Sequence, residues 1–111
     1  MEFALSTTDV DGWAVVAVTG ELDVYTAPAL EEALGDLVDA GRVSIVVDLT
    51  GVSFMDSTGL GLLIKALKWT REKDGTLRIV ANTDKILKVF RVTGLDSVLD
   101  LHASVAEALE A

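Results

Sequence analysis

The chain has 111 residues, half of them apolar, with 18 acidic against nine basic side chains and a formal charge of −9. Residues 1–111 suffice for one domain with its own core, and the acidic balance argues against nucleic acid as a partner, because nucleic acids are bound through Lys and Arg. The chain has no cysteine, no basic signal-peptide start and no apolar run near the ~20 residues of a membrane helix, so we expect a cytoplasmic protein without direct membrane insertion.

The first third of the sequence predicts a β-hairpin followed by a helix. Apolar and polar residues alternate over 3–7, and the Asp-Gly pair at 11–12 is a turn signal before an apolar strand at 13–19. Residues 20–25 are expected to form a loop. Thr26 is then placed to cap a helix that has a proline in its first turn.

The middle of the chain is expected to be the centre of the fold. Residues 43–49 are almost continuously apolar, as in a strand that is covered on both faces. Asp48, inside this strand, is expected to have a hydrogen-bonded partner. Residues 50–55 are expected to be a loop, after which the sequence changes to helical spacing. Asp56 or Ser57 can accept a hydrogen bond from the first free N–H groups of that helix, so one of them is its expected N-cap.

The last third predicts a strand at 77–81, a short helix that opens at 82–84 and ends near Gly94, a brief strand around 98–99 and a final helix. The order strand, helix, strand favours right-handed parallel crossovers. The expected fold class is therefore α/β, with a mixed sheet of about four to five strands, an N-terminal antiparallel hairpin, parallel crossovers and about four helices.

Three segments are expected to meet at the edge of the sheet where the parallel strands end. They are Gly20 to Asp23, Asp56 to Gly61, and Asn82 to Asp84, and each follows a predicted strand. Open α/β sheets usually place their functional sites at this carboxyl edge. We therefore expect Asp23 to lie near Ser57.

The residues offer little support for catalysis or for a cofactor. A serine nucleophile needs a nearby base, and His102, the only histidine, is expected at the start of the last helix, away from Ser57. Gly59 and Gly61 have the spacing of a dinucleotide fingerprint, but Ile64 stands where a third glycine is required. We expect no catalytic residue and no cofactor.

Carboxylates and a hydroxyl near the expected site each allow two interpretations. Asp23, Asp48 and Asp56 are better explained as loop caps than as a metal cage, so we expect no metal. Ser57 is either an N-cap and nothing more, or an acceptor of phosphate. A helix N-terminus favours an anion by about 0.3–1 kcal/mol, so the fold is expected to tolerate a phosphate there.

The central helix carries a second apolar line, formed by Leu62, Ala66 and Trp69. In one interpretation this line packs against the third helix. In the other it is an exposed strip that docks on a partner, with Trp69 or Met55 as its anchor.

Three strings in the sequence resemble one known family. The anti-sigma factor antagonists of the STAS domain family have a phosphorylation loop that resembles Asp56-Ser57-Thr58-Gly59-Leu60-Gly61. The same family has strings similar to Gly20-Glu21-Leu22-Asp23 with Thr26-Ala27-Pro28, and to Arg91-Val92-Thr93-Gly94-Leu95. The resemblance covers essentially the whole chain.

The resemblance implies a regulator that is not an enzyme. The unmodified protein is expected to bind an anti-sigma factor that is also a serine kinase, and thereby to release a sigma factor. The kinase is expected to phosphorylate Ser57, with Thr58 as the alternative acceptor, and a PP2C-type phosphatase to remove the phosphate. The implied partner-binding residues are Glu21, Asp23, Met55, Asp56, Ser57, Thr58, Gly59 and Leu62. An alternative is a STAS-type accessory subunit that docks on a membrane transporter without a phosphate cycle.

Overall fold

Strands β1 (Ala4–Val10) and β2 (Trp13–Leu22) form the expected antiparallel hairpin at one edge of a five-stranded sheet. The computed structural model describes residues 2–111. In it, β3 (Ser44–Met55) pairs parallel with β2, β4 (Thr76–Val80) with β3, and β5 (Asp100–His102) with β4. The order across the sheet is thus the order along the chain, and the expected mixed sheet is confirmed.

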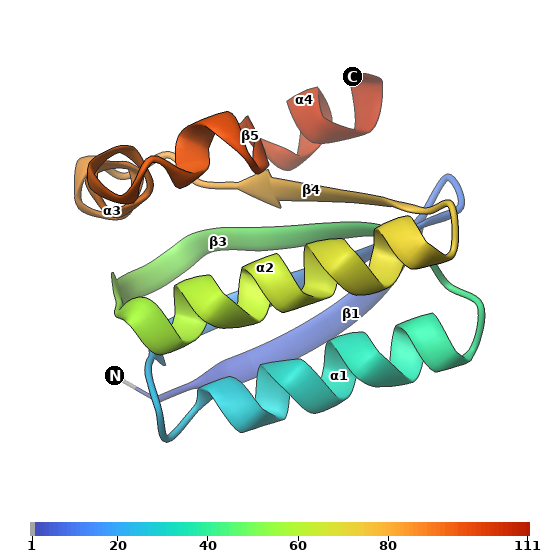
Figure 1. Ribbon diagram of the computed structural model, residues 1–111, viewed down its shortest axis with the longest axis horizontal. Helices are drawn as coiled ribbons and strands as arrows, with labels where there is room; N and C mark the ends of the chain where they lie inside the picture. Colours follow the sequence, from blue (N-terminus) through green and yellow to red (C-terminus); the bar gives the residue numbers. More distant parts are fainter. Residues whose placement is uncertain (1) are drawn as a thin grey trace.

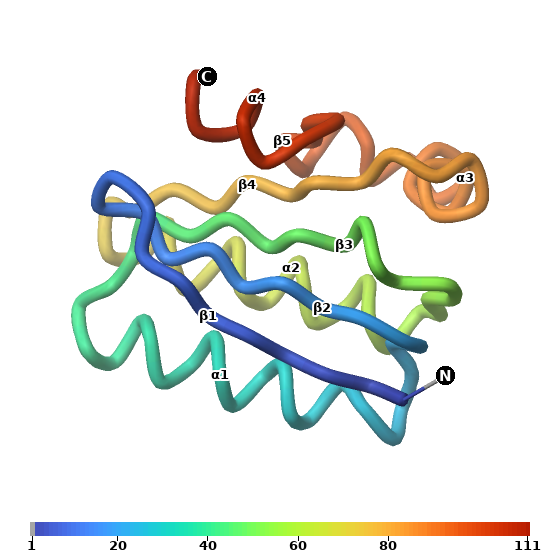
Figure 2. Tube along the Cα trace, turned by 180° about the vertical axis from the view of Figure 1, so that it is seen from behind, coloured from blue at the N-terminus to red at the C-terminus, as the bar shows by residue number. Residues whose placement is uncertain are grey.

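Two long helices cover one face of this sheet. α1 (Ala27–Asp39) connects β2 to β3, and α2 (Ser57–Glu72) connects β3 to β4. Figures 1 and 2 show the two helices side by side, with their N-terminal ends at the same end of the molecule. α3 (Asp84–Thr93) and the short 3-10 turn η1 (Leu95–Ser97) lead to β5, which α4 (Val105–Glu110) follows.

The main core lies between the sheet and the helices α1, α2 and α3. One side of each strand faces it, because alternate residues of a strand point to the same face. Its fully buried side chains include Val16, Leu30, Ile45, Leu63, Ile79 and Phe90.

β2 and β3 are longer than the sequence predicts. The expected loop at 20–25 begins only after Leu22, and the expected loop at 50–55 is the second half of β3, so both expectations are wrong. At two places, between Asp48 and Gly51 and between Val52 and Phe54, β3 has one more residue than the stretch of β2 opposite it. Such bulges bend and twist a strand but keep it in the sheet. They also break the alternation of side chains on which strand prediction depends.

Asp48 lies at the first of these bulges. Its Oδ1 accepts the N–H of Thr50 at 3.0 Å, so the expected hydrogen-bonded partner is confirmed. The bond explains how a carboxylate is accommodated next to an apolar strand segment, because it satisfies a backbone donor at the irregular part of the ladder.

The opposite face of the sheet has a smaller core. Three valines, one each from β2, β3 and β4, pack there with Ala108 of α4. Arg78 of β4 lies on this face, with its guanidinium carbon 4.4 Å from the centre of the Trp13 ring. Its Nη1 donates to the carbonyl of Ala108 at 2.5 Å, which ties α4 to the sheet.

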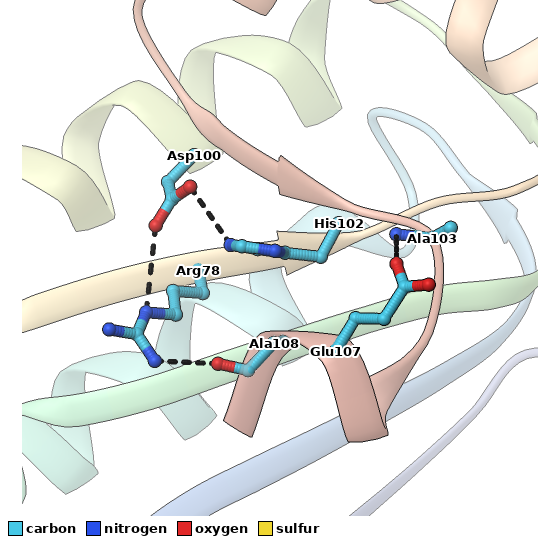
Figure 3. Close-up of polar contacts among 6 residues, drawn as sticks. All are labelled: Arg78, Asp100, His102, Ala103, Glu107 and Ala108. Carbon is cyan, nitrogen blue, oxygen red and sulfur yellow. Dashed lines mark hydrogen bonds and ion pairs between the residues drawn. The ribbon is translucent and has the colours of Figure 1, made fainter. Parts of the chain in front are cut away.

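Figure 3 shows that Arg78 also belongs to a polar cluster with β5. Its Nε lies 3.5 Å from Oδ2 of Asp100, and Oδ1 of Asp100 lies 2.9 Å from Nε2 of His102. In the same view, Oε2 of Glu107 accepts the N–H of Ala103 at 3.3 Å, at the start of α4. The cluster therefore joins β4, β5 and α4 on the face away from α1 and α2.

β5 begins later than the sequence predicts. The N–H groups of residues 98 and 99 both donate to the carbonyl of Leu95, so these residues complete a turn and the strand begins at Asp100. The expected strand at 98–99 is therefore wrong. His102 is a strand residue, and its expected place at the start of the last helix is also wrong.

Replacing Arg78 with alanine is expected to lower the free energy of unfolding by about 2 kcal/mol, because the change removes the contact with Trp13 and leaves the Ala108 carbonyl without its donor. Urea denaturation measures the loss. Lys88→Ala, on the exposed side of α3, is the control and is expected to change stability by less than about 0.5 kcal/mol. Equal effects of the two substitutions would contradict the role of Arg78.

Candidate functional site

Ser57 is the first residue of α2, and Asp56 is the N-cap of this helix. Asp56 has an extended backbone, and its Oδ1 accepts the N–H of Thr58 at 2.9 Å. The interpretation of Ser57 as an N-cap and nothing more is therefore wrong. Ser57 is exposed, and within residues 2–111 no hydrogen bond joins its hydroxyl to another group. The side chain is thus accessible to a second molecule.

The segment that includes the last two residues of β2 and the turn after them (residues 21–26, the acidic turn) lies directly beside Ser57. The N–H of Asp56 donates to the carbonyl of Leu22 at 3.3 Å. Asp56, just before Ser57, is therefore hydrogen-bonded to Leu22, just before Asp23. Two of the three segments expected at this edge do meet.

Asp23 and Thr26 hold the acidic turn in shape. Oδ1 of Asp23 accepts the N–H groups of Tyr25 and Thr26, at 2.9 and 3.2 Å. Oγ1 of Thr26 donates to the carbonyl of Glu21 at 2.7 Å and accepts the N–H of Asp23 at 2.9 Å. Thr26 occupies the N-cap position of α1 without a side-chain hydrogen bond to the helix, so the expected capping bond is wrong. Its hydroxyl closes the turn instead.

The third segment expected at this edge follows β4, and it is separated from the acidic turn by β3. β4 ends at Val80, opposite Asp48, while β3 continues beyond that point. Residues 82–84 therefore lead into α3 beside the outer part of β3, where Nζ of Lys85 lies 5.6 Å from the centre of the Phe54 ring. Within the described residues, a hydrogen bond joins the first two segments to each other, and none joins the third segment to either of them.

The eight residues expected to contact a partner differ in exposure. Those that face solvent are Glu21, Ser57 and Thr58, and those that are half-buried are Asp23 and Asp56. Those that are buried are Gly59, Met55 and Leu62, the last two being 3% and 4% exposed. Met55 is buried, so the interpretation of Met55 as an exposed anchor is wrong. Met55, Gly59 and Leu62 support the exposed residues of this surface through packing.

Leu62, Ala66 and Trp69 belong to the contact between α2 and α1. Leu62 and Ala66 are buried, and the Trp69 ring lies beside Gly35 of α1. The interpretation as an exposed strip is therefore wrong. The third helix is also the wrong packing partner, because α1 runs alongside α2 (Figure 1).

An apolar groove of about 440 Å³ lies between the N-terminal halves of α1 and α2. The residues that line this α1–α2 groove are Val24, Ala27, Pro28, Glu31, Thr58, Gly61, Leu62 and Lys65. Nζ of Lys65 and Oε1 of Glu31 form an ion pair at 3.0 Å between the two helices. Val24 and its neighbour Tyr25 are 58% and 88% exposed. The sequence signal for this pair is two large apolar residues inside an expected loop, which are typical of a contact surface.

The described residues do not bring a histidine or a metal-binding group to Ser57. His102 lies in the polar cluster on the opposite face of the sheet (Figure 3), and no group of side chains within residues 2–111 is arranged to hold a metal ion. A phosphate on Ser57 would add about 1.5–2 negative charges. It would lie at the N-terminus of α2, where the helix dipole favours an anion.

None of the helices in the described part of the chain is long and apolar enough to cross a membrane.

Replacing Asp56 with alanine is expected to lower the free energy of unfolding by about 1 kcal/mol, because the N–H of Thr58 loses its acceptor. Asp56→Ser keeps a capping oxygen and is expected to recover most of the loss. Ser57→Ala is the neighbouring control, with an expected change within about 0.5 kcal/mol. Thermal denaturation compares the three, and a larger loss for Ser57→Ala than for Asp56→Ala would contradict the assignment of the cap.

The fold and the site together define an α/β domain with a five-stranded mixed sheet that presents a serine at a helix start beside an acidic turn. The model of the STAS domain matches residues 4–108. The chain therefore belongs to the STAS domain family, and the family resemblance of the sequence is confirmed.

The relatives are similar to this chain over most of its length. An anti-sigma-B factor antagonist of Staphylococcus aureus is 42% identical over 102 residues, which make up 92% of this chain and 94% of the relative. One of Staphylococcus epidermidis is 39% identical over 102 residues, with the same coverage of 92% and 94%. The crystal structure of an anti-sigma factor antagonist from Mycobacterium paratuberculosis has a TM-score of 0.91 and 34% identity, covering 98% of this chain and 92% of that one.

Proposed function

We propose that this protein is an anti-sigma factor antagonist whose binding is switched off by phosphorylation of Ser57. In the unmodified state it binds an anti-sigma factor that is also a serine kinase, and this binding releases a sigma factor for transcription. A PP2C-type phosphatase restores the unmodified state. The protein acts in the cytoplasm by binding, without catalysis of its own and without a cofactor.

One observation carries the proposal: the Ser57 hydroxyl is exposed at the start of α2 and lies beside the acidic turn. A kinase can reach this hydroxyl without unfolding the domain. The fold tolerates the added charge, since the phosphate would lie where the dipole of α2 is positive. The names of the relatives support the class of partner, because each is called an antagonist of an anti-sigma factor or of anti-sigma-B factor.

The phosphate is expected to weaken partner binding, although it does not destabilise the fold. It would stand on a surface that already holds Glu21, Asp23 and Asp56, and a partner suited to the unmodified surface would have to desolvate it or move away. A loss of about 3 kcal/mol in binding free energy weakens an interaction more than a hundredfold. The Ser57-Thr58-Gly59 string favours this switch over the alternative of a fixed subunit of a transporter.

The experiment is to incubate the protein with ATP and the anti-sigma factor kinase encoded in the same genome, and to locate the phosphate by peptide mass spectrometry. Phosphate is expected on Ser57 in the parent and in Thr58→Ala. Ser57→Ala is expected to remain unmodified and to stay bound to the kinase in a pull-down. Modification of Thr58, or failure of the parent to bind the kinase, would contradict the proposal.

A further inference from the structure

Two glycines lie in the first turns of α2, and the packing of the fold requires only one of them. A Cβ on Gly59 would lie 2.8 Å from Cγ of Met55 and 3.0 Å from the side chain of Leu22. A Cβ on Gly61 would have nothing within 4 Å. Glycine inside a helix is less favourable than alanine, because it loses more backbone freedom on folding. The fold therefore gives no reason for glycine at position 61.

Gly61 lies on an exposed line of α2 between Ser57 and Lys65. Residues four apart lie above one another on a helix, and all three of these positions are exposed. Gly61 also lines the α1–α2 groove, together with Thr58 on α2 and Val24 of the acidic turn. A partner that binds at Ser57 and extends along α2 therefore reaches Gly61 one helical turn further on.

The charges around the groove indicate what kind of segment fits it. Glu21, Asp23 and Asp56 give the Ser57 end of this surface a negative charge, whereas Lys65 at the other end is paired with Glu31 at 3.0 Å. The groove between the two ends is apolar. A complementary segment carries basic side chains toward the acidic turn and an apolar side chain toward the groove.

We propose that Gly61 is a docking residue, whose missing side chain lets such a segment of the kinase partner approach the backbone of α2 and place an apolar side chain in the α1–α2 groove. The inference rests on the proposed function, since it extends the surface at Ser57 along α2. Gly59 is required for packing, and Gly61 is required for close approach.

The test measures the stability of Gly61→Ala and its affinity for the anti-sigma factor kinase. The melting temperature is expected to rise by about 4 °C, because alanine is the better helix former, while the affinity falls at least tenfold. Gly61→Leu is expected to weaken binding further. Gly35→Ala is the matched control, since Gly35 lies inside α1 and its Cβ would meet only Trp69, at 3.9 Å. It is expected to raise the melting temperature similarly and to leave the affinity unchanged.

The outcomes separate this inference from the proposed function. If the parent binds the kinase and is switched by phosphorylation, but Gly61→Ala binds as tightly as the parent, the docking role is overturned and the proposed function stands. An equal loss of affinity in Gly35→Ala would also overturn the docking role, because stiffening of the helices would then explain the loss. If the parent itself does not bind the kinase, the proposed function fails and this inference fails with it.

Discussion

Ser57→Asp is expected to bind the anti-sigma factor kinase about tenfold more weakly than the parent, a loss of about 1.4 kcal/mol in binding free energy. The aspartate supplies one negative charge, whereas a phosphoserine supplies nearly two. The substitution is therefore expected to reproduce only part of the effect of phosphorylation. Calorimetric titration of the kinase with each variant measures the difference.

The fold is expected to be unaffected by this substitution. Ser57 is exposed at the first position of α2, and an acidic residue in the first turn of a helix is stabilising. The loss of affinity would therefore arise at the interface, where the new carboxylate lies beside Asp23 and Asp56. Added salt is expected to reduce the loss, because salt screens repulsion between exposed charges.

Ser57→Asn is the matched control, because asparagine has the shape of aspartate without its charge. Its affinity is expected to stay within about threefold of the parent, a difference below 1 kcal/mol. Equal losses for the two variants would show that shape and not charge governs docking. An aspartate variant that folds and binds like the parent would contradict the charge mechanism outright.

Gly59→Val is expected to lower the free energy of unfolding by about 3 kcal/mol, the upper end of the range for overpacking a core. A single Cβ on Gly59 already lies 2.8 Å from Met55 and 3.0 Å from Leu22, and valine adds two further methyl groups. Both neighbours lie at the ends of strands that position the site, so the strain is expected at the join between β2, β3 and α2. Urea denaturation measures the loss.

The control for this prediction is the same substitution two residues further along α2. Gly61→Val adds the same atoms at a position where a Cβ meets nothing within 4 Å, and valine and glycine are both weak helix formers. Its stability is expected to lie within about 0.5 kcal/mol of the parent. Equal losses at the two positions would contradict the packing requirement at Gly59.

The sequence predicted the parts of the fold that depend on local signals. The turn at Asp11-Gly12 marks the hairpin, and both residues have positive φ angles, of 51° and 86°. Gly94, with a φ of 75°, ends α3 where expected. Helical spacing located the long helix α2, because its buried positions recur every three to four residues. These features need no knowledge of distant parts of the chain.

Features that depend on contacts between distant segments were not predictable in the same way. β3 continues through residues 50–55 with two bulges. The residues of that stretch do not predict the bulges, because each bulge depends on pairing with β2. The burial of Leu62 depends on the position of α1, and the spacing of apolar residues in α2 does not predict that position. The place of His102 depends on a turn at Leu95 that delays β5.

The candidate site shows the same division. An acidic residue and a serine before a helical pattern indicate a helix start, and the structure is needed to decide which one is the cap. Gly59 and Gly61 look equivalent in the sequence, and only the neighbours of each Cβ separate them. The α1–α2 groove exists only once two helices lie side by side, so it could not be read from either segment alone.

The most direct test is a calorimetric titration of the anti-sigma factor kinase with the unmodified protein and with the protein phosphorylated at Ser57, at one ionic strength. The expected result is an affinity at least a hundredfold lower for the phosphorylated form, with an unchanged melting temperature, since about 3 kcal/mol of binding free energy is lost. Affinities within threefold of each other, for two equally well folded forms, would contradict the proposed switch.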